Sequence, residues 1–233
     1  MRRQGSPLSG PVSPGEVPTR TLPPPRRPLY LRPVDIHGSL ATEARIATPI
    51  LYIHVDESCL GNQFQGRANP GGAAGLVEFW NGDEWVRRDY WISERDTTNN
   101  RMAIRSGIEG LTLLTKRCRV EVVSDSQYLV KGMNEWLSGW KAKGWKRRGG
   151  PIQNLELWQQ LERAAAVQDV QWSWVRGHTG HPKNEYANDL AVQAARELTR
   201  SGGLVPSGFQ SWLERQRETK GRYLDYFEFE APA

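Results

Sequence analysis

Long apolar runs are missing from this sequence. No stretch approaches the roughly 18 consecutive apolar residues needed to cross a membrane, and no apolar segment follows the basic residues at the N-terminus. A membrane-spanning protein and a secretory signal are therefore not expected.

Cysteine is also scarce. Cys59 and Cys118 are the only two in the chain. They are too few for a disulfide framework, and their spacing is not that of a zinc or CxxC site. This composition favours a reducing compartment, and we expect a cytoplasmic monomer with no membrane partner.

The first 47 residues have little capacity to build a core. Prolines cluster there, including the run Pro23–Pro25, with glycine, serine and arginine between them. Such a segment buries too little apolar surface to fold, and proline lacks a backbone donor. We expect residues 1–47 to be a disordered tail, with a nucleic-acid tether or a proline-rich ligand as the alternative.

Basic charge and tryptophan are what the chain does contain. The formal net charge is +5, and several of the 10 tryptophans lie among lysines and arginines. Excess positive charge favours a polyanionic partner. The mixture of basic and aromatic side chains is more typical of nucleic-acid binding than of a membrane surface.

The pattern over residues 48–200 predicts one mixed α/β domain. Strands are predicted at Ile50–Val55, Gly72–Trp80, Trp85–Ile92, Arg119–Val123 and Val170–Val175. Helices are predicted at 98–115, Gln127–Met133, Glu135–Lys143, Asn154–Ala166 and Asn184–Leu198. Three adjacent strands followed by helix-linked strands imply a five-stranded mixed sheet flanked by helices.

Residues 201–233 are predicted to be a C-terminal extension of this domain. They begin with the linker Ser201–Gly203 and continue into a short amphipathic helix at Phe209–Thr219. An aromatic and acidic stretch, Tyr223–Phe229, then has the character of a strand. We expect the extension to dock on the domain or, alternatively, to bind a partner.

Two aspartates follow predicted strands. Asp56 ends the first strand and Asp125 follows the fourth, and the carboxyl ends of such strands line the crevice where open sheets bind ligands. If the two strands are neighbours, the carboxylates repel each other unless a cation lies between them. Oxygen ligands suit Mg²⁺ or Mn²⁺. The alternative is that each aspartate caps the helix after its strand.

At these residues the sequence resembles type I ribonuclease H. Five stretches carry the resemblance, in the family's order: DxSCLGN at 56–62, TNNRM at 98–102, SDSQY at 124–128, WxxxWxxxxW with its lysines at 136–145 and WVRGHTGHPxNE at 174–185, where x marks a position that does not contribute to the match. The resemblance implies a ribonuclease H-like fold. It also implies an endonuclease that uses divalent metal to hydrolyse the RNA strand of an RNA/DNA hybrid.

The resemblance also shows where this chain departs from the family. Of the four carboxylates that hold the metal ions in the family, Asp56 and Asp125 match two. Ala103 stands where the family has a glutamate, and Asn188 where it has an aspartate. Alanine offers no ligand, and asparagine offers only a neutral carbonyl oxygen. Cleavage is therefore expected to be weakened, and Ala103→Glu with Asn188→Asp is expected to raise it.

Neighbouring carboxylates are candidates to compensate for the two losses. Asp189 lies only about 100° round the helix from Asn188 and is a possible metal ligand. Glu57 follows Asp56 and is expected on the opposite face of a continuing strand, although an irregular strand end would let it reach the site.

His178 is the third predicted catalytic residue, beside Asp56 and Asp125. The matching histidine of the family assists proton transfer near the scissile phosphate. The glycines on either side, in the Gly177–Gly180 loop, fit that role. The alternative is a loop histidine that donates to backbone.

Residues that grip the hybrid are better preserved than the carboxylates. Four amides match residues that reach the minor groove, namely Asn62, Asn99, Asn100 and Gln127, and Thr98 matches a residue near a DNA phosphate. A basic and aromatic protrusion at residues 136–148, the handle, is predicted to contact the DNA strand through Trp136, Lys141, Lys143, Trp145, Lys146, Arg147 and Arg148. Packing between helices is the alternative for Trp136 and Trp140.

These features leave three functional interpretations. The first is a ribonuclease H with an eroded or rearranged site. The second is a hybrid-binding module that no longer cleaves. The third is a scaffold for the tails, which leaves the preserved amides and the handle unexplained.

Overall fold

A six-stranded mixed sheet organises the described part of the chain. The computed structural model describes residues 49–61, 69–177 and 180–228, so the predicted tail at 1–47 lies outside it. The strands are β1 (Ile50–Cys59), β2 (Gly71–Trp80), β3 (Trp85–Glu94), β4 (Arg119–Ser124), β5 (Asp169–Trp174) and β6 (Val205–Pro206). Their order across the sheet is β5-β4-β1-β2-β3-β6.

The pairing confirms the predicted mixed sheet and adds one strand. β1, β2 and β3 pair antiparallel, whereas β4 and β5 run parallel to β1. The predicted count of five was one too low, because β6 pairs with β3 through only two residues. A two-residue strand carries no alternation that could be recognised in a sequence.

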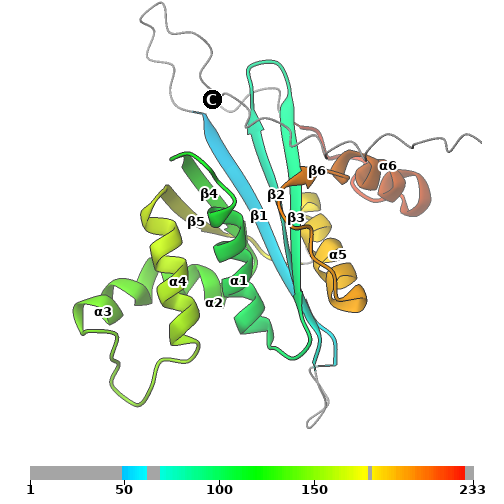
Figure 1. The fold of residues 1–233 in the computed structure, drawn as a ribbon. Coiled ribbons are helices and arrows are strands. Elements are labelled where there is room, and N and C mark those ends of the chain that lie inside the picture. Colours follow the sequence, from blue (N-terminus) through cyan, green and yellow to red (C-terminus); the bar gives the residue numbers. More distant parts are fainter. Residues whose placement is uncertain (1–48, 62–68, 178–179, 229–233) are drawn as a thin grey trace, which may run out of the picture. The chain divides into compact units, whose positions relative to one another are not determined.

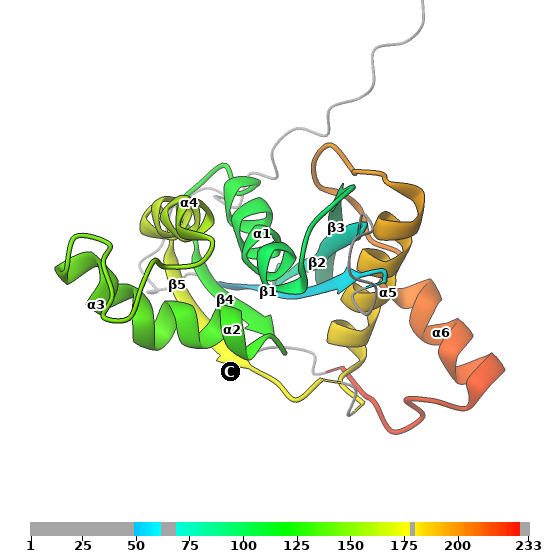
Figure 2. The same cartoon turned by 90° about the horizontal axis from the view of Figure 1, so that it is seen from below.

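Helices cover both faces of the sheet, as Figures 1 and 2 show. They are α1 (Asn99–Thr112), α2 (Gln127–Lys131), α3 (Leu137–Ala142), α4 (Leu155–Ala166), α5 (Pro182–Glu197) and α6 (Phe209–Lys220). The larger core cluster joins the sheet to α1, α2 and α4, and α5 packs on the opposite face of β1 and β2. No described helix has the length and apolar character that a membrane crossing requires.

The two short helices predicted at 127–133 and 135–143 are one continuous segment. A π-helical turn at Gly132–Trp136 joins α2 to α3. Gly132 lies so close to Trp158 that an added Cβ would be 2.0 Å from the indole ring. The wider turn therefore lets the helix pass over a large core side chain without a break.

The C-terminal extension packs on α5. Phe209, Trp212, Leu213 and Tyr223 are buried with Tyr186 of α5, and the helix predicted at 209–219 is present as α6. The predicted strand-like stretch at 223–229 was wrong over its described part, 223–228, which contains no strand. The reason is that the Arg217 side chain donates to the carbonyls of Tyr223 and Tyr226, which a strand would use for pairing.

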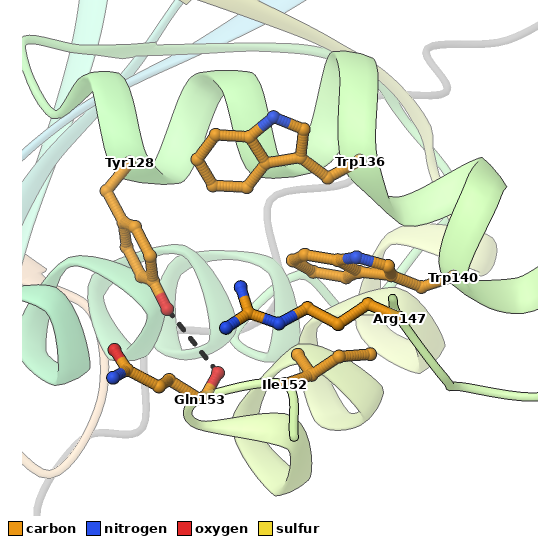
Figure 3. A pocket seen from close by; sticks show the side chains of 6 residues that line it. All are labelled: Tyr128, Trp136, Trp140, Arg147, Ile152 and Gln153. Atoms are coloured by element: carbon orange, nitrogen blue, oxygen red, sulfur yellow. Dashed lines mark hydrogen bonds between the residues drawn. The ribbon is translucent and has the colours of Figure 1, made fainter. Parts of the chain in front are cut away.

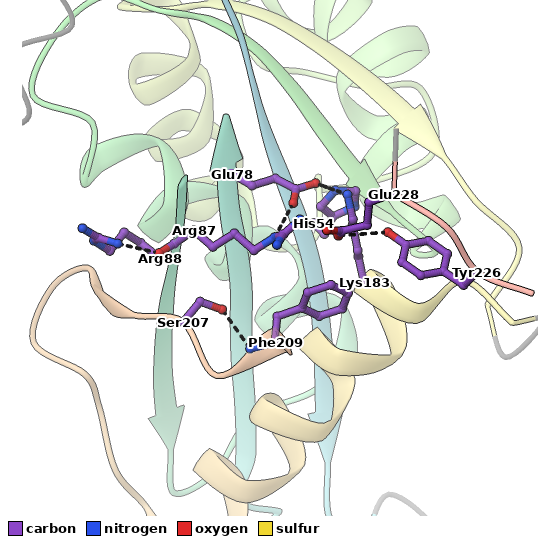
Figure 4. Close-up of polar contacts among 9 residues, drawn as sticks. All are labelled: His54, Glu78, Arg87, Arg88, Lys183, Ser207, Phe209, Tyr226 and Glu228. Atoms are coloured by element: carbon purple, nitrogen blue, oxygen red, sulfur yellow. Dashed lines mark hydrogen bonds and ion pairs between the residues drawn. The ribbon is translucent and has the colours of Figure 1, made fainter. Parts of the chain in front are cut away.

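A buried ionic cluster fixes the first turn of α5 on the sheet (Figure 4). Glu78 of β2 is 1% exposed and accepts from His54 Nε2 at 3.1 Å, from Arg87 Nε at 2.9 Å and from Lys183 of α5. Burial opposes ionisation of Glu78, but these partners outweigh it and hold its pKa at about 2. Arg87 also pairs with Glu228 of the extension. The cluster therefore joins three strands, α5 and the extension.

Candidate active site

The two predicted aspartates lie side by side on neighbouring parallel strands, Asp56 within β1, which continues past it to Cys59, and Asp125 directly after β4. β1 and β4 pair in a register that sets Val55 opposite Ser124, so Asp56 and Asp125 follow as the next pair. Asp56 is buried and Asp125 half-buried. The prediction that these strands are neighbours is confirmed.

Asp56 is held from two directions. The backbone amide of Glu57 donates to Oδ1 at 2.6 Å, and Asn184 of α5 donates through Nδ2 to Oδ2 at 3.1 Å. The same amide nitrogen of Asn184 also donates to the carbonyl of Val55 at 3.3 Å. Burial and the charge of Asp125 outweigh these donors and raise the pKa of Asp56 to about 8.

Glu57 faces α1, on the other side of β1 from Asp56. Side chains alternate along a strand, so Glu57 shares a face with Ile53 and Val55, which pack in the core with Ala103 of α1. Burial raises the pKa of Glu57 well above its usual value, and the charges of Asp56 and Asp125 raise it further. The expected orientation of Glu57 is therefore right, yet its carboxyl is close enough to feel both aspartates.

One oxygen of Glu57 lacks a partner. The Oε2 atom is buried and makes no hydrogen bond, which is costly for a carboxyl group unless something else binds it. An orphaned acceptor beside two further carboxyl groups is the pattern expected of a site that a cation completes.

Ala103 fills the place on α1 that the family gives to a glutamate. It is fully buried and packs against the same face of β1 that carries Glu57. The β1–α1 interface thus holds one carboxylate, and that carboxylate comes from the strand instead of the helix.

Asn188 and Asp189 point in different directions. Asn188 is four residues after Asn184 and therefore lies on the same face of α5, the face that meets Asp56. Asp189 accepts from Trp212 Nε1 of α6 at 2.8 Å. Its carboxylate is thus engaged by the extension, and this position does not support the predicted role as a metal ligand.

Asp125 is confined by the last residue of β5 and by the segment that follows this strand. The indole of Trp174 donates to the Asp125 carbonyl at 2.9 Å. A Cβ added to Gly177 would lie 2.2 Å from Asp125 Oδ2, so a larger residue at this position would displace the carboxylate. The predicted residues His178 and Asn62 lie outside the described residues.

Two of these supporting residues had no predicted role. Asn184 and Trp174 belong to the recognised stretch at 174–185, but they were not assigned a contact. The spacing of four residues between Asn184 and Asn188 is a usable signal for Asn184, because it places both amides on one helix face. No pattern in the sequence indicates the contact from Trp174 to a backbone carbonyl.

The donor set fits a hard divalent cation. It consists of carboxylate and amide oxygens, which Mg²⁺ and Mn²⁺ prefer, and it includes the orphaned Glu57 oxygen. Within residues 49–61, 69–177 and 180–228, no three histidine, cysteine or acidic side chains already converge on one point. The three carboxyl groups come from β1 and from the residue that directly follows β4.

Predicted hybrid-binding residues lie at the N-terminal ends of two helices. Thr98 caps α1 by accepting from the Arg101 amide at 3.3 Å, and Asn99 and Asn100 form the exposed first turn. Gln127 is exposed in the first turn of α2, directly after Asp125. Helix N-termini carry partial positive charge and unpaired amides, so this arrangement suits phosphate groups.

The handle surrounds an aromatic pocket (Figure 3). Its lining is Tyr128, Trp136, Trp140, Arg147, Ile152 and Gln153. The Trp136 and Trp140 ring centroids are 5.9 Å apart, and Trp140 also contacts core residue Trp158 at 5.6 Å. The tryptophans therefore do pack between helices, which was the alternative reading, while Trp136 and Trp140 still present a surface to the pocket.

The basic side chains of the handle differ in their surroundings. Lys141 pairs with Glu162 of α4, and Trp145 packs against the core. Lys143, Lys146, Arg147 and Arg148 are exposed. The positive charge available to a phosphate backbone is therefore concentrated at 143–148.

Comparison with known proteins places this site in a family. The family model for RNase H matches residues 49–196. The ribonuclease H of Pelobacter propionicus is 44% identical over 147 residues, which are 63% of this chain and 85% of that protein. The ribonuclease H of Stutzerimonas stutzeri is 43% identical over 150 residues, covering 62% of this chain and 93% of the other.

A solved structure shares both the fold and much of the sequence. LC9-RNase H1 is 49% identical and superposes with a TM-score of 0.68, covering 74% of this chain and 84% of its own. It is described as a type 1 RNase H with the type 2 active-site motif.

Proposed function

Since the chain belongs to the ribonuclease H family, we propose that it is an active ribonuclease H that cleaves the RNA strand of RNA/DNA hybrids with Mg²⁺ or Mn²⁺. Its carboxylates are Asp56, Glu57 and Asp125, and Asn188 supplies an amide oxygen. Glu57 takes the part that the family assigns to position 103. This proposal replaces the expectation of weakened cleavage.

The orphaned carboxyl of Glu57 carries this proposal. Glu57 is half-buried on the face of β1 that packs against α1, its Oε2 is buried without a hydrogen-bond partner, and burial and the charges of Asp56 and Asp125 raise its pKa. A buried carboxylate oxygen without a partner destabilises the folded chain, and a bound cation would provide that partner. With Glu57 the nominal charge of the site is −3 instead of −2, which strengthens its attraction for dications.

The similarity to LC9-RNase H1 supports this reading. That protein is also described as a type 1 enzyme with an active-site motif of another type. A type 1 scaffold is therefore able to carry a carboxylate set that differs from the usual one.

The supporting residues of this chain have distinct parts in the reaction. Metal ions held by Asp56, Glu57, Asp125 and Asn188 would supply an activated water and stabilise the leaving oxygen. Asn184 and the Glu57 amide orient the Asp56 carboxylate, while Trp174 and Gly177 determine where Asp125 lies. His178 is proposed to move a proton near the scissile phosphate.

Substrate binding is assigned to the residues that face solvent around this site. Asn99, Asn100 and Gln127 offer amides to the minor groove, as does Asn62. The 2′-hydroxyls displayed there distinguish RNA from DNA. The handle, through its exposed cations at 143–148, contacts the DNA strand.

A cleavage assay tests the function directly. The purified chain is incubated with an end-labelled RNA/DNA hybrid and Mg²⁺, Mn²⁺ or a chelator, and products are resolved on a gel. We expect internal cuts in the RNA strand that require metal and that Asp125→Asn abolishes, whereas Asp189→Asn leaves them. Hybrid binding without metal-dependent cuts at any enzyme concentration would support the inactive binding module instead.

A further inference from the structure

The first turn of α5 reaches two neighbouring strands through two adjacent residues. Lys183 forms an ion pair with Glu78 of β2. Asn184 donates through one nitrogen to the Val55 carbonyl at 3.3 Å and to the Asp56 carboxylate at 3.1 Å, both on β1. The end of the helix is therefore attached at once to the buried ionic cluster and to the active site.

The contact from Asn184 to Asp56 depends closely on where the end of the helix lies. Asn184 is 1% exposed, so its side-chain amide has no access to water as an alternative partner. Its two bonds, at 3.1 and 3.3 Å, are at the long end of the range for N–H···O hydrogen bonds. A shift of the first turn by about 0.5 Å away from β1 would therefore break both bonds and release the Asp56 carboxylate.

Glu78 gives Lys183 a fixed binding point. The sheet holds both oxygens of its buried carboxylate, because His54 of β1 donates to Oε1 at 3.1 Å and Arg87 of β3 donates to Oε2 at 2.9 Å. Lys183 binds Oε1 from the helix (Figure 4). The ion pair therefore joins α5 to a carboxylate that the strands hold independently of the helix.

The position of Lys183 is unfavourable for the helix itself. It is the second residue of α5, where the partial positive charge of a helix N-terminus disfavours a cation. A buried ion pair also contributes little net stability, because the desolvation of both charges offsets their attraction. The pair does supply direction. The Lys183 side chain is only 14% exposed and its ammonium lies 5.0 Å from the centre of the Trp85 ring, so the charge is confined to the carboxylate of Glu78.

We propose that Lys183 is a positioning residue for cleavage: its ion pair with Glu78 sets the first turn of α5 at the height where Asn184 holds the Asp56 carboxylate. Asn188, one turn later on the same face of the helix, is set by the same anchor. This inference rests on the proposed function. It gives the ion pair between α5 and β2 a part in catalysis.

Two matched variants separate positioning from stability. Lys183→Met and Arg87→Met each remove one cation from Glu78, and the two side chains are 14% and 13% exposed. Each variant leaves Glu78 with two of its three side-chain donors, and methionine keeps much of the apolar stem. Both variants should therefore fold, with similar losses of Tm. They differ in that Lys183 belongs to α5 and Arg87 to β3.

For Lys183→Met we expect kcat for hybrid cleavage in Mg²⁺ to fall by about three- to tenfold, less than the roughly 100-fold cost of a 1 Å misplacement. In Arg87→Met kcat should stay near the native value. KM should change little in either variant, because the residues assigned to hybrid binding lie outside α5. Lys183→Arg keeps the charge and should recover part of the loss. Equal kcat in the two methionine variants would overturn the proposal.

A double-mutant cycle identifies the route. If Lys183 acts through Asn184, adding Lys183→Met to Asn184→Ala should lower kcat no further. A loss by the same factor in the native and Asn184→Ala backgrounds would show that Lys183 acts by another route and would overturn the proposal.

The side-chain amide of Asn184 reports on the contact without any catalysis. Its NMR signal, assigned by its absence in Asn184→Ala, should shift and exchange with solvent faster in Lys183→Met than in the native chain or in Arg87→Met. If the native chain fails to cleave hybrid but shows this pattern, the proposed function fails while the positioning of Asn184 stands. An unchanged signal in Lys183→Met, or a changed signal with unchanged kcat in an active enzyme, would reject the positioning role.

Discussion

Glu57 and Ala103 belong to the two surfaces of one interface, the contact between β1 and α1. At the residue scale, the chain keeps a carboxylate near Asp56 and Asp125. That carboxylate comes from strand β1, whereas the family has it on the helix that corresponds to α1. The small side chain at 103 is then a requirement, because a second carboxylate in the same buried space would repel the first.

Moving the carboxylate from position 57 to position 103 tests whether Glu57 replaces the glutamate that the family has at position 103. Glu57→Ala should lower the cleavage rate by at least about 100-fold, the order found when one preorganised charge-stabilising group is removed. Adding Ala103→Glu to that variant should restore a measurable part, because the new side chain starts from the facing element. Initial rates on a labelled hybrid decide the point.

Ala103→Glu in the native background is the matching control. The site already contains Glu57, so the added side chain should overpack the interface, cost about 1 to 3 kcal/mol of stability and reduce cleavage. This expectation reverses the one drawn from sequence for position 103. Faster cleavage by this single variant would contradict the assignment of Glu57.

Gly177 offers a second test at the same scale. In Gly177→Ala the new methyl group would meet the Asp125 carboxylate at 2.2 Å, so the carboxylate must move. We expect about a 10- to 100-fold loss of kcat, consistent with misplacement of a reacting group. Gly139→Ala, with no atom within 4 Å of the added Cβ, should leave kcat unchanged; equal losses in both would contradict the steric explanation.

At the scale of whole elements, the helices and the handle provide the charge and the exposed amides for substrate binding. The N-terminal ends of α1 and α2 bring partial positive charge and exposed amides to the site, while the handle presents cations at a distance from it. α5 contributes Asn184 and Asn188 from one face and binds the extension through another. The affinity for a polyanion and the chemistry are therefore carried by different elements.

Charge removal from the handle should separate these two contributions. Lys143, Lys146, Arg147 and Arg148 changed together to Ala should weaken hybrid binding and lower the salt dependence of affinity by about 0.9 per lost phosphate contact. Lys141→Ala should matter less, because Lys141 pairs with Glu162. Binding titrations at several salt concentrations measure the affinity for hybrid and its salt dependence. If the quadruple variant has the same salt dependence as the native chain, the handle does not contact the phosphate backbone.

For the whole molecule, the buried carboxyl groups couple stability to pH and to metal. The pKa of Asp56 is about 8 in the folded chain against an ordinary value of 3.8, and that of Glu57 is also raised. A raised pKa means that folding favours the protonated form. The associated stability is complete below the unfolded pKa and is lost as pH rises through about 8.

Thermal unfolding in chelator should therefore show a Tm that falls between pH 7 and 8.5. A loss of about 1 kcal/mol would lower Tm by about 2 to 4 °C in a protein of this size. This window lies above the ordinary pKa of histidine, so the lowered pKa values of His54 and His181 contribute little change. Asp56→Asn should reduce the fall, and Mg²⁺ should restore Tm at pH 8.5; a pH-independent Tm would contradict the assignment.

Much of the architecture was predictable because it depends on local patterns. The apolar strand segments, the cap at Thr98 and the positions of Asp56 and Asp125 follow from residue order, and the structure confirms the mixed sheet and the neighbouring strands. The recognised stretches led to the family and to most hybrid-binding candidates. These features could be predicted because they depend on residues that are close in the sequence or on the known topology of the family.

Other features of the site depend on contacts between segments that are far apart in the sequence. The sequence alone favoured Asp189 as a possible metal ligand and placed Glu57 on the opposite face of its strand, able to reach the site only if the strand end is irregular. The fold separates them: the Glu57 carboxyl is within electrostatic reach of both aspartates, while the Asp189 carboxylate accepts a hydrogen bond from Trp212 of α6. Likewise, Arg222 meets Glu185 across 37 residues. Which side chain meets which depends on helix packing against the sheet, a property that no local pattern contains.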